Sequence, residues 1–335
     1  MISVEDLAGV VPAAESAQVV WLAAIICALL AVVAAAFLGE SPEAALRRHL
    51  AAAHHLSHHF KFDDLVWNHV SARNGAQYLV TSGTHHFDEV TERNLVVSNS
   101  EIANKTADVI HGAIYAARPD VHAIVHHHSP AVTAVSALAD GLQFLSQDSA
   151  AFYGKVSYHD WEGTSLDYDE RSRIAKALGA DAHTLIMRNH GACTVGRNVG
   201  EAWTRYYILD RICAQQLAVA GQRVVQPDAE VLSHAAAQVA DDTPFAAGKM
   251  EWPALLRMAD RLRGRRGGPT ARRLLAAAAR GAAFGAVAAA LVLCSEAAAE
   301  RAAGALAILL EPAAVCIAAA VCSLQFAWAR PQFLR

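Results

Sequence analysis

The stretch Val121-His122-Ala123-Ile124-Val125-His126-His127-His128-Ser129 decides the fold, together with Arg188-Asn189-His190-Gly191 further along the chain. Its apolar part predicts a buried strand. Because side chains alternate across a strand, His126 and His128 project from the same face. A third imidazole, His190, follows another apolar run and can complete one face of a tetrahedral site. Three nitrogen ligands with an open fourth position are typical of a catalytic divalent metal, usually zinc.

The other histidines of the chain, which has 17 in all, are assigned elsewhere. His127 points to the opposite face of the strand, so we exclude it from the metal site. His122 shares the face of the pair, and we expect it in the core or beside the site. A His-x-His pair alone is weak evidence, so the assignment depends on His190 and on the surrounding motifs. We expect no ligand among His54, His55, His58, His59, His85 and His86.

Length, charge and cysteine content limit the class of protein. The 335 residues suffice for one good-sized domain with additional segments. A net charge of −4 argues against a nucleic-acid binder, which would carry a basic face. The six cysteines are scattered and form no Cys-x-x-Cys pair. This pattern favours neither a disulfide framework nor a thiolate metal site, and it indicates a reducing compartment for the middle of the chain.

The N-terminal part contains an apolar segment at residues 16–39 that carries no charge. It is long enough to cross a bilayer as a helix. A cleaved signal peptide is the alternative, but the preceding segment, 1–15, is acidic and lacks the required basic region. Arg47 and Arg48 follow the apolar segment. The positive-inside rule therefore predicts a membrane protein whose central domain faces the cytoplasm.

The C-terminal part is rich in alanine. An arginine-rich linker at 263–280 precedes an apolar stretch at 281–328, which Glu311-Pro312 interrupts. We expect a helical hairpin in the membrane with both ends cytoplasmic, because arginines stand on both sides of it. The alternative is an amphipathic or packed pair of alanine-rich helices.

Between these ends, residues 41–262 predict a single α/β domain. Ser41-Pro42-Glu43 is typical of a helix start, with a capping serine, an early proline and an acid near the positive end of the helix dipole. Short β-type runs occur at 77–81 and 94–97, and the histidine strand follows. We expect helices at 41–57, 107–117, 130–139, 169–178 and 199–220.

Five motifs of this domain occur in the order in which a known family has them. They are Asn68-His69-Val70-Ser71-Ala72-Arg73, Val80-Thr81-Ser82-Gly83, the segment 111–120, His126-x-His128-Ser129 and Asn189-His190-Gly191. With them, about two thirds of the chain resembles the class II aldolase/adducin domain family, and within it the adducin heads more than the sugar-phosphate aldolases. The resemblance implies a three-layer α/β/α domain with a central β-sheet, a homo-oligomer that is a tetramer in the aldolases, and a divalent metal, zinc above all, on His126, His128 and His190.

The resemblance also implies a substrate site and exposes a departure. Asn68, Ser82 and Gly83 match the loops that hold a substrate phosphate in family aldolases; alternatively, Asn68 and Ser82 only satisfy loop backbone groups. The aldolases carry a general-base glutamate four residues before the helix histidine, and this chain has Ala107 there. Alanine cannot move a proton. The candidates for that role are Asp108, Tyr153, Tyr158 and His159.

Two functions therefore remain open. The first is a metal-dependent, aldolase-like lyase for a small sugar or hydroxy-carbonyl compound, in which the metal stabilises an enediolate and another group moves the proton. The second is a non-catalytic, adducin-like oligomerisation module at a membrane, with the actin cytoskeleton as a partner by analogy only. Ala107 and the likeness to adducin heads favour the module. The complete histidine trio favours the lyase, which we prefer.

Overall fold

The computed structural model describes residues 40–98, 100–101 and 103–264. They fall within one compact unit, Glu40–Ala271. The segments at 1–15, 16–39 and 281–328, and nearly all of the linker at 263–280, lie outside the described residues. Among the helices of the described part, none has both the length and the hydropathy of a membrane span.

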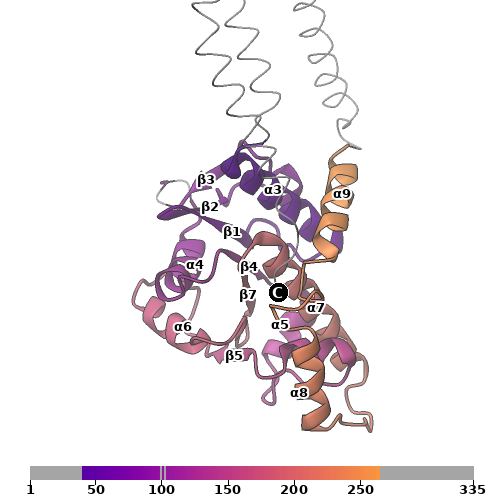
Figure 1. Cartoon of the computed structure of the whole chain (residues 1–335). Helices are drawn as coiled ribbons and strands as arrows, with labels where there is room; N and C mark the ends of the chain where they lie inside the picture. The colour runs from indigo at the N-terminus through magenta and orange to yellow at the C-terminus, as the bar shows by residue number, and fades with distance from the viewer. Residues whose placement is uncertain (1–39, 99, 102, 265–335) are drawn as a thin grey trace, which may run out of the picture. The chain divides into compact units, whose positions relative to one another are not determined.

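A mixed sheet of seven strands forms the centre of the described domain, in the order β3-β2-β1-β4-β7-β6-β5 (Figure 1). Neighbouring strands are antiparallel, except that β5 and β6 are parallel. The histidine strand β4 therefore lies in the middle, between β1 and β7. The strands span His69–Asn74 (β1), Gln77–Thr81 (β2), Leu95–Val97 (β3), Ala123–His127 (β4), Val156–His159 (β5), Thr184–Met187 (β6) and Gly191–Gly196 (β7).

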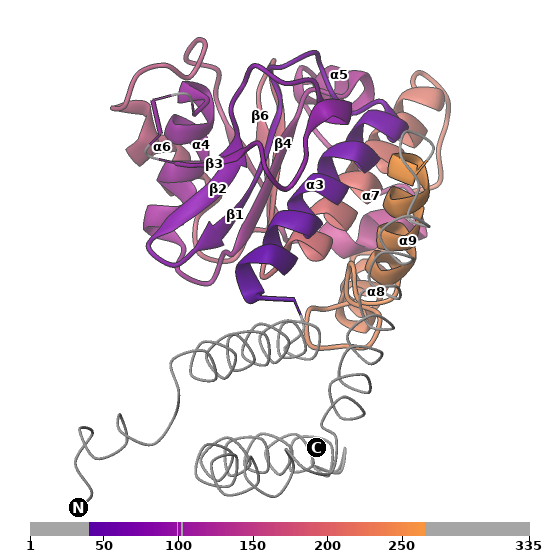
Figure 2. The same cartoon turned by 90° about the horizontal axis from the view of Figure 1, so that it is seen from above.

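Helices cover both faces of the sheet, α4 and α6 on one side and α3, α7 and α9 on the other (Figure 2). Each face has its own apolar core, one around Val125 and Trp203 and the other around Ile110, Ile124 and Leu185. The expected three-layer α/β/α architecture is therefore confirmed. The helices span Pro42–Phe60 (α3), Lys105–Ala117 (α4), Pro130–Ser136 (α5), Glu170–Leu178 (α6), Val199–Ala218 (α7), Ala229–Gln238 (α8) and Glu251–Gly264 (α9), with 3-10 turns at Phe87–Glu89 (η1) and Gln147–Phe152 (η2).

The helices begin where the sequence provides capping side chains. Ser41, Asn104 and Asn198 each accept a hydrogen bond from a main-chain amide in the first turn of α3, α4 and α7. The helices and strands expected from the sequence are confirmed to within a few residues at their ends. Two helices, α8 and α9, were not among those expected; their fully buried residues are Leu232 in α8 and Trp252 and Ala259 in α9.

Candidate metal centre

The three predicted metal ligands come together at one end of the adjacent strands β4 and β7. His126 belongs to β4, His128 follows it directly, and His190 ends the turn that connects β6 to β7. Their ligand atoms all lie within 4.8 Å of one another. The Nε2 atoms of His126 and His128 are 3.0 Å apart, and the His190 ring centroid lies 4.9 and 4.7 Å from the centroids of these two rings.

The turn that presents His190 explains the Asn-His-Gly motif. Asn189 adopts φ +56°, a left-handed conformation that asparagine enters more readily than most residues. Gly191 packs so closely that a Cβ atom there would lie 2.5 Å from the carbonyl oxygen of His127. The motif therefore follows from the backbone of the turn, and the histidine between these two residues is aimed by it.

The hydrogen bonds of the trio leave lone pairs that face one another. His126 Nδ1 lies 3.2 Å from the carbonyl oxygen of Ala192, so this nitrogen donates and Nε2 keeps its lone pair. His128 Nδ1 lies 3.6 Å from an Asp64 carboxylate oxygen, which likewise directs Nε2 toward His126. Two lone pairs 3.0 Å apart repel each other unless a proton or a cation lies between them. The donor set therefore fits a divalent cation held by imidazoles.

Burial keeps these rings in the neutral form that metals bind. It lowers the pKa of His126 well below its ordinary value, with a further contribution from the neighbouring imidazoles. It also lowers the pKa of His190 to about 4, and His128 and His159 add to the effect. The pKa of His128 is lowered by burial as well, although Asp64 opposes this.

Predictions were also made for two other histidines, one in β4 and one directly before it. His127 points into the other core, where its Nε2 lies 2.9 Å from Ser57 Oγ, and it is not part of the trio. The expectation that His122 lies in the core or beside the site is wrong. His122 directly precedes β4, which begins at Ala123, and its side chain is exposed.

Beside the trio lies a buried polar chain that the sequence did not reveal. The His69 ring stacks on His126 at 4.8 Å between centroids. His69 Nδ1 lies 2.9 Å from His111 Nε2, and Ser71 Oγ lies 2.6 Å from His111 Nδ1 and 2.9 Å from the Tyr115 hydroxyl. Burial lowers the pKa of His111 to about 3. The available signal was alternation in β1, which puts His69 and Ser71 on one face, but only the pairing of β1 with β4 brings them to the metal ligands.

The predicted substrate-binding residues differ in whether their polar atoms already have hydrogen-bond partners within the protein. Asn68 is buried directly before His69, and neither its Oδ1 nor its Nδ2 has a hydrogen-bond partner. Ser82 Oγ is already engaged, 3.0 Å from Thr84 Oγ1 and 2.7 Å from His85 Nδ1. Gly83 adopts φ +74° and packs on Asn104. Asn68 is therefore the member of this group with free hydrogen-bonding capacity.

The four candidate proton carriers lie in different surroundings. Asp108 accepts a hydrogen bond from the Tyr78 hydroxyl at 3.0 Å and lies 3.9 Å from Arg171, on the α4–α6 side of the sheet. The Tyr153 ring packs on Phe144. The Tyr158 hydroxyl accepts from the main-chain amide of Leu142. His159 is buried at the end of β5, and its carbonyl oxygen accepts a hydrogen bond from the amide of Arg188, in the turn that carries His190.

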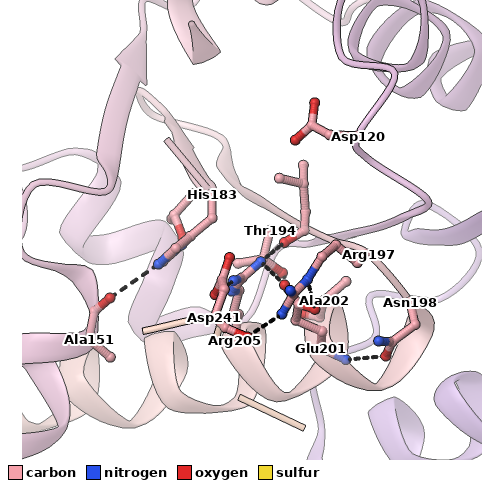
Figure 3. Close-up of polar contacts among 12 residues, drawn as sticks. Asp120, Ala151, His183, Thr194, Arg197, Asn198, Glu201, Ala202, Arg205 and Asp241 are labelled. Atoms are coloured by element: carbon pink, nitrogen blue, oxygen red, sulfur yellow. Dashed lines mark hydrogen bonds and ion pairs between the residues drawn. The ribbon is translucent and has the colours of Figure 1, made fainter. Parts of the chain in front are cut away.

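A cavity of about 1120 Å³ opens at the opposite ends of β4 and β7, around Val121 and Gly196. Figure 3 shows its polar wall, in which Arg205 lies between Glu201 and Asp241. The Arg205 Nη1 atom is 2.8 Å from Glu201, and Arg197 contacts the same glutamate at 3.0 Å. The charges are paired with one another, although Glu201 Oε1 makes no hydrogen bond. At the trio, the ligand atoms are left open.

The fold is a three-layer α/β/α domain with a histidine trio at one end of its central strands, and comparison with known proteins identifies its family. Residues 48–217 match the family described as Class II Aldolase and Adducin N-terminal domain. A putative aldolase class 2 protein of Caulobacter vibrioides is 33% identical over 227 residues, which cover 63% of this chain and 88% of that protein. The chain belongs to the class II aldolase and adducin N-terminal domain family.

Relatives lie on both sides of the family. Rat alpha-adducin is 35% identical over 263 residues, covering 69% of this chain but only 35% of the adducin. The crystal structure of an aldolase II superfamily protein from Pseudomonas syringae is 35% identical with a TM-score of 0.61, covering 66% of this chain and 94% of that one. An L-fuculose 1-phosphate aldolase from Glaciozyma antarctica is 27% identical with a TM-score of 0.59, covering 68% and 94%.

Proposed function

We propose that this protein is a divalent-metal-dependent lyase that cleaves or forms a carbon–carbon bond next to the carbonyl of a small sugar or hydroxy-carbonyl compound. The observation that carries the proposal is the convergence of three neutral imidazoles on one point. The structural likeness to an L-fuculose 1-phosphate aldolase supports this reaction class. The metal we propose is zinc, which suits three histidine ligands and an open position.

Each group has a separate task in this proposal. When bound, the metal polarises the substrate carbonyl and stabilises the negative charge that develops there. His126, His128 and His190 hold it through ring nitrogens. The free amide of Asn68 binds an oxygen of the substrate, since it has both a donor and an acceptor to offer. His159 carries the proton that Ala107 cannot carry.

A non-catalytic, adducin-like module is the second candidate, and Ala107 is the observation that favours it. Its side chain is fully buried within an apolar core on α4, so no titratable group occupies the position of the family's glutamate. The identity to rat alpha-adducin supports the same alternative. In this case the metal would be structural, and a cytoskeletal partner such as actin would be tested by co-sedimentation of the full chain.

Assembly and location are further proposals. The family likeness supports a homo-oligomer, which light scattering of the purified protein would test against the mass of one chain. The apolar segments at 16–39 and 281–328 support attachment to a membrane, with the domain at 41–262 on the cytoplasmic side. Fractionation followed by protease protection of closed vesicles would test both the attachment and the orientation.

The proposal of a metal-dependent lyase is tested by elemental analysis of the full chain and of a His126→Ala/His128→Ala double variant. We expect one divalent metal per chain in the natural protein and none in the double variant. His122→Ala is the matched control, because this exposed histidine lies on the same segment outside the trio. Equal metal content in all three proteins would contradict the site. Bound metal without cleavage of hydroxy-carbonyl compounds would favour the adducin-like module.

A further inference from the structure

A buried imidazole–carboxylate pair lies between the end of β5 and the start of α6. His159 is the last residue of β5, and Glu170 is the first residue of α6. Both are about 5% exposed or less, and His159 Nε2 lies 3.2 Å from Glu170 Oε1. Figure 1 shows β5 at the edge of the sheet beside α6. Because burying a carboxylate is costly unless it is paired and hydrogen-bonded, this contact requires a reason.

The connection between β5 and α6 is built to hold that carboxylate. Ser165 donates a hydrogen bond from its hydroxyl to the same Glu170 oxygen at 3.3 Å. Ser165 is itself buried and adopts φ +35°, a conformation that costs a side-chain-bearing residue energy. Such strain persists only where the surrounding structure enforces it, and it concentrates at functional sites. Glu162, which Arg173 holds at 2.7 Å, adds a second carboxylate 3.7 Å from His159 Nε2.

This environment fixes the tautomer of His159. Nε2 faces two carboxylates, which only accept hydrogen bonds, so Nε2 carries the hydrogen. In the neutral ring, Nδ1 then bears the lone pair. Among the described residues Nδ1 has no hydrogen-bond partner, and it is not one of the fully enclosed unpaired atoms. The ring therefore offers a single basic nitrogen that is still free.

The backbone joins His159 to the turn that carries His190. His159 pairs with Met187 in the parallel register of β5 and β6, and its carbonyl oxygen accepts a hydrogen bond from the Arg188 amide at 2.8 Å. His190 follows in the same turn. Arg188 and His190 both belong to the turn between β6 and β7, so the main chain at His159 is hydrogen-bonded to the turn that carries a metal ligand.

We propose that Glu170 is a positioning residue that holds His159 in the Nε2–H tautomer, so that His159 Nδ1 carries the proton of the lyase reaction. In the cleavage direction, Nδ1 takes the proton of the substrate hydroxyl as the carbon–carbon bond breaks. The electron pair of that bond passes to the carbonyl half of the substrate. The imidazolium then returns the same proton to the carbon of that half, which balances the reaction without any further reactant. This inference rests on the proposed function.

The test uses full-length protein loaded with zinc and dihydroxyacetone as the probe. Exchange of a carbon-bound hydrogen of the probe for deuterium in D₂O reports the return of a proton. We expect Glu170→Gln to lower kcat for exchange about 10- to 100-fold, with KM and zinc content unchanged. Because the two residues act as a unit, Glu170→Gln added to His159→Gln should cost nothing more. The matched control is Asp169→Asn, an exposed neighbouring acid that should leave kcat unchanged.

A readout besides activity is the tautomer itself. In the ¹⁵N-histidine spectrum of the natural protein, His159 should carry its hydrogen on Nε2, and Glu170→Gln should reduce the population of that form. If the natural protein exchanges the hydrogen and Glu170→Gln does so with an unchanged kcat, the role of Glu170 is overturned and the proposed function stands. A hydrogen on Nδ1 of His159 in the natural protein would have the same consequence. A zinc-loaded natural protein without exchange would overturn the proposed function, and the role of Glu170 would fall with it.

Discussion

The two ends of strands β4 and β7 carry polar groups of opposite character. At the histidine end, ring nitrogens face one another with open lone pairs, and the Asn68 amide has no partner. At the other end, Arg205 is held between Glu201 and Asp241, so the buried charges neutralise one another (Figure 3). Buried polar groups normally form hydrogen bonds with one another. Buried polar groups without such partners are therefore available to bind a ligand. The paired end is instead prepared to hold α7 and the segment after α8 in place.

Removal of one metal ligand should have the largest effect on the histidine end. We expect His126→Ala to weaken metal binding and lyase activity by a factor of about 10³ or more, since two imidazoles rarely retain zinc against competition. The binding constant is measured by competition with a chelator of known affinity. The free energy of unfolding of the metal-free protein should change far less. If the metal-free variant unfolded at much lower urea concentration than the metal-free natural protein, the trio would be a structural feature and the contrast between the ends would weaken.

Loss of Arg205 should have the opposite effect, a large loss of stability with no loss of metal binding. We expect Arg205→Ala to lower the free energy of unfolding by about 3–5 kcal/mol, because it leaves the buried Glu201 carboxylate without its closest buried partner. Metal content should be unchanged. Arg197→Ala is the matched control: this half-exposed arginine contacts the same glutamate, and its loss should cost under about 1 kcal/mol. If both variants lost the same free energy of unfolding, the burial of Arg205 would not be the reason for its effect. Urea unfolding of the metal-loaded proteins measures both.

Acid should weaken the fold through His183, which lines the cavity of the paired end. Burial, and secondarily the charge of Arg205, lowers the pKa of His183 to about 4 in the folded protein. The unfolded chain has the ordinary value near 6.5, so it binds more protons than the folded chain between these pH values. The free energy of unfolding therefore falls as the pH drops from about 6.5 to 4, by at most about 3 kcal/mol for this residue. The slope of urea midpoint against pH should be smaller in His183→Gln, and an unchanged slope would contradict the assignment.

The smallest expected effect distinguishes two of the predicted substrate-binding residues. Asn68→Ala should raise KM about 10-fold, because a buried amide with no protein partner is available to a substrate oxygen. Its cost in stability should be small, since no hydrogen bond within the protein is lost. Ser82→Ala should leave KM near the natural value, because that hydroxyl is already bonded to Thr84 and His85. Steady-state kinetics measure KM for both variants. A larger increase in KM for Ser82→Ala than for Asn68→Ala would contradict the distinction between them.

Much of the fold and part of the site could be predicted from the sequence, and the limits have a physical reason. Alternation and a capping serine are local signals, and they indicated β4 and α3. The contact between His69 and His111 depends on how β1 lies against β4 and α4, which local patterns do not encode. The pairing of His159 with Glu170 likewise depends on the path of the chain between β5 and α6. His122 was misplaced because alternation indicates the face of a strand on which a side chain lies, and not whether that face is covered at the end of the strand.

The pairing of β4 with β7 makes the metal centre a reporter of folding. His126 and His190 are brought together by one antiparallel register, in which His126 lies opposite Cys193. A slip of that register by a single residue would turn His126 and His128 away and present His127 in their place. During refolding, the uptake of metal should therefore mark the moment at which these two central strands have found their correct alignment. A dye that changes colour when it loses metal would follow that event in real time.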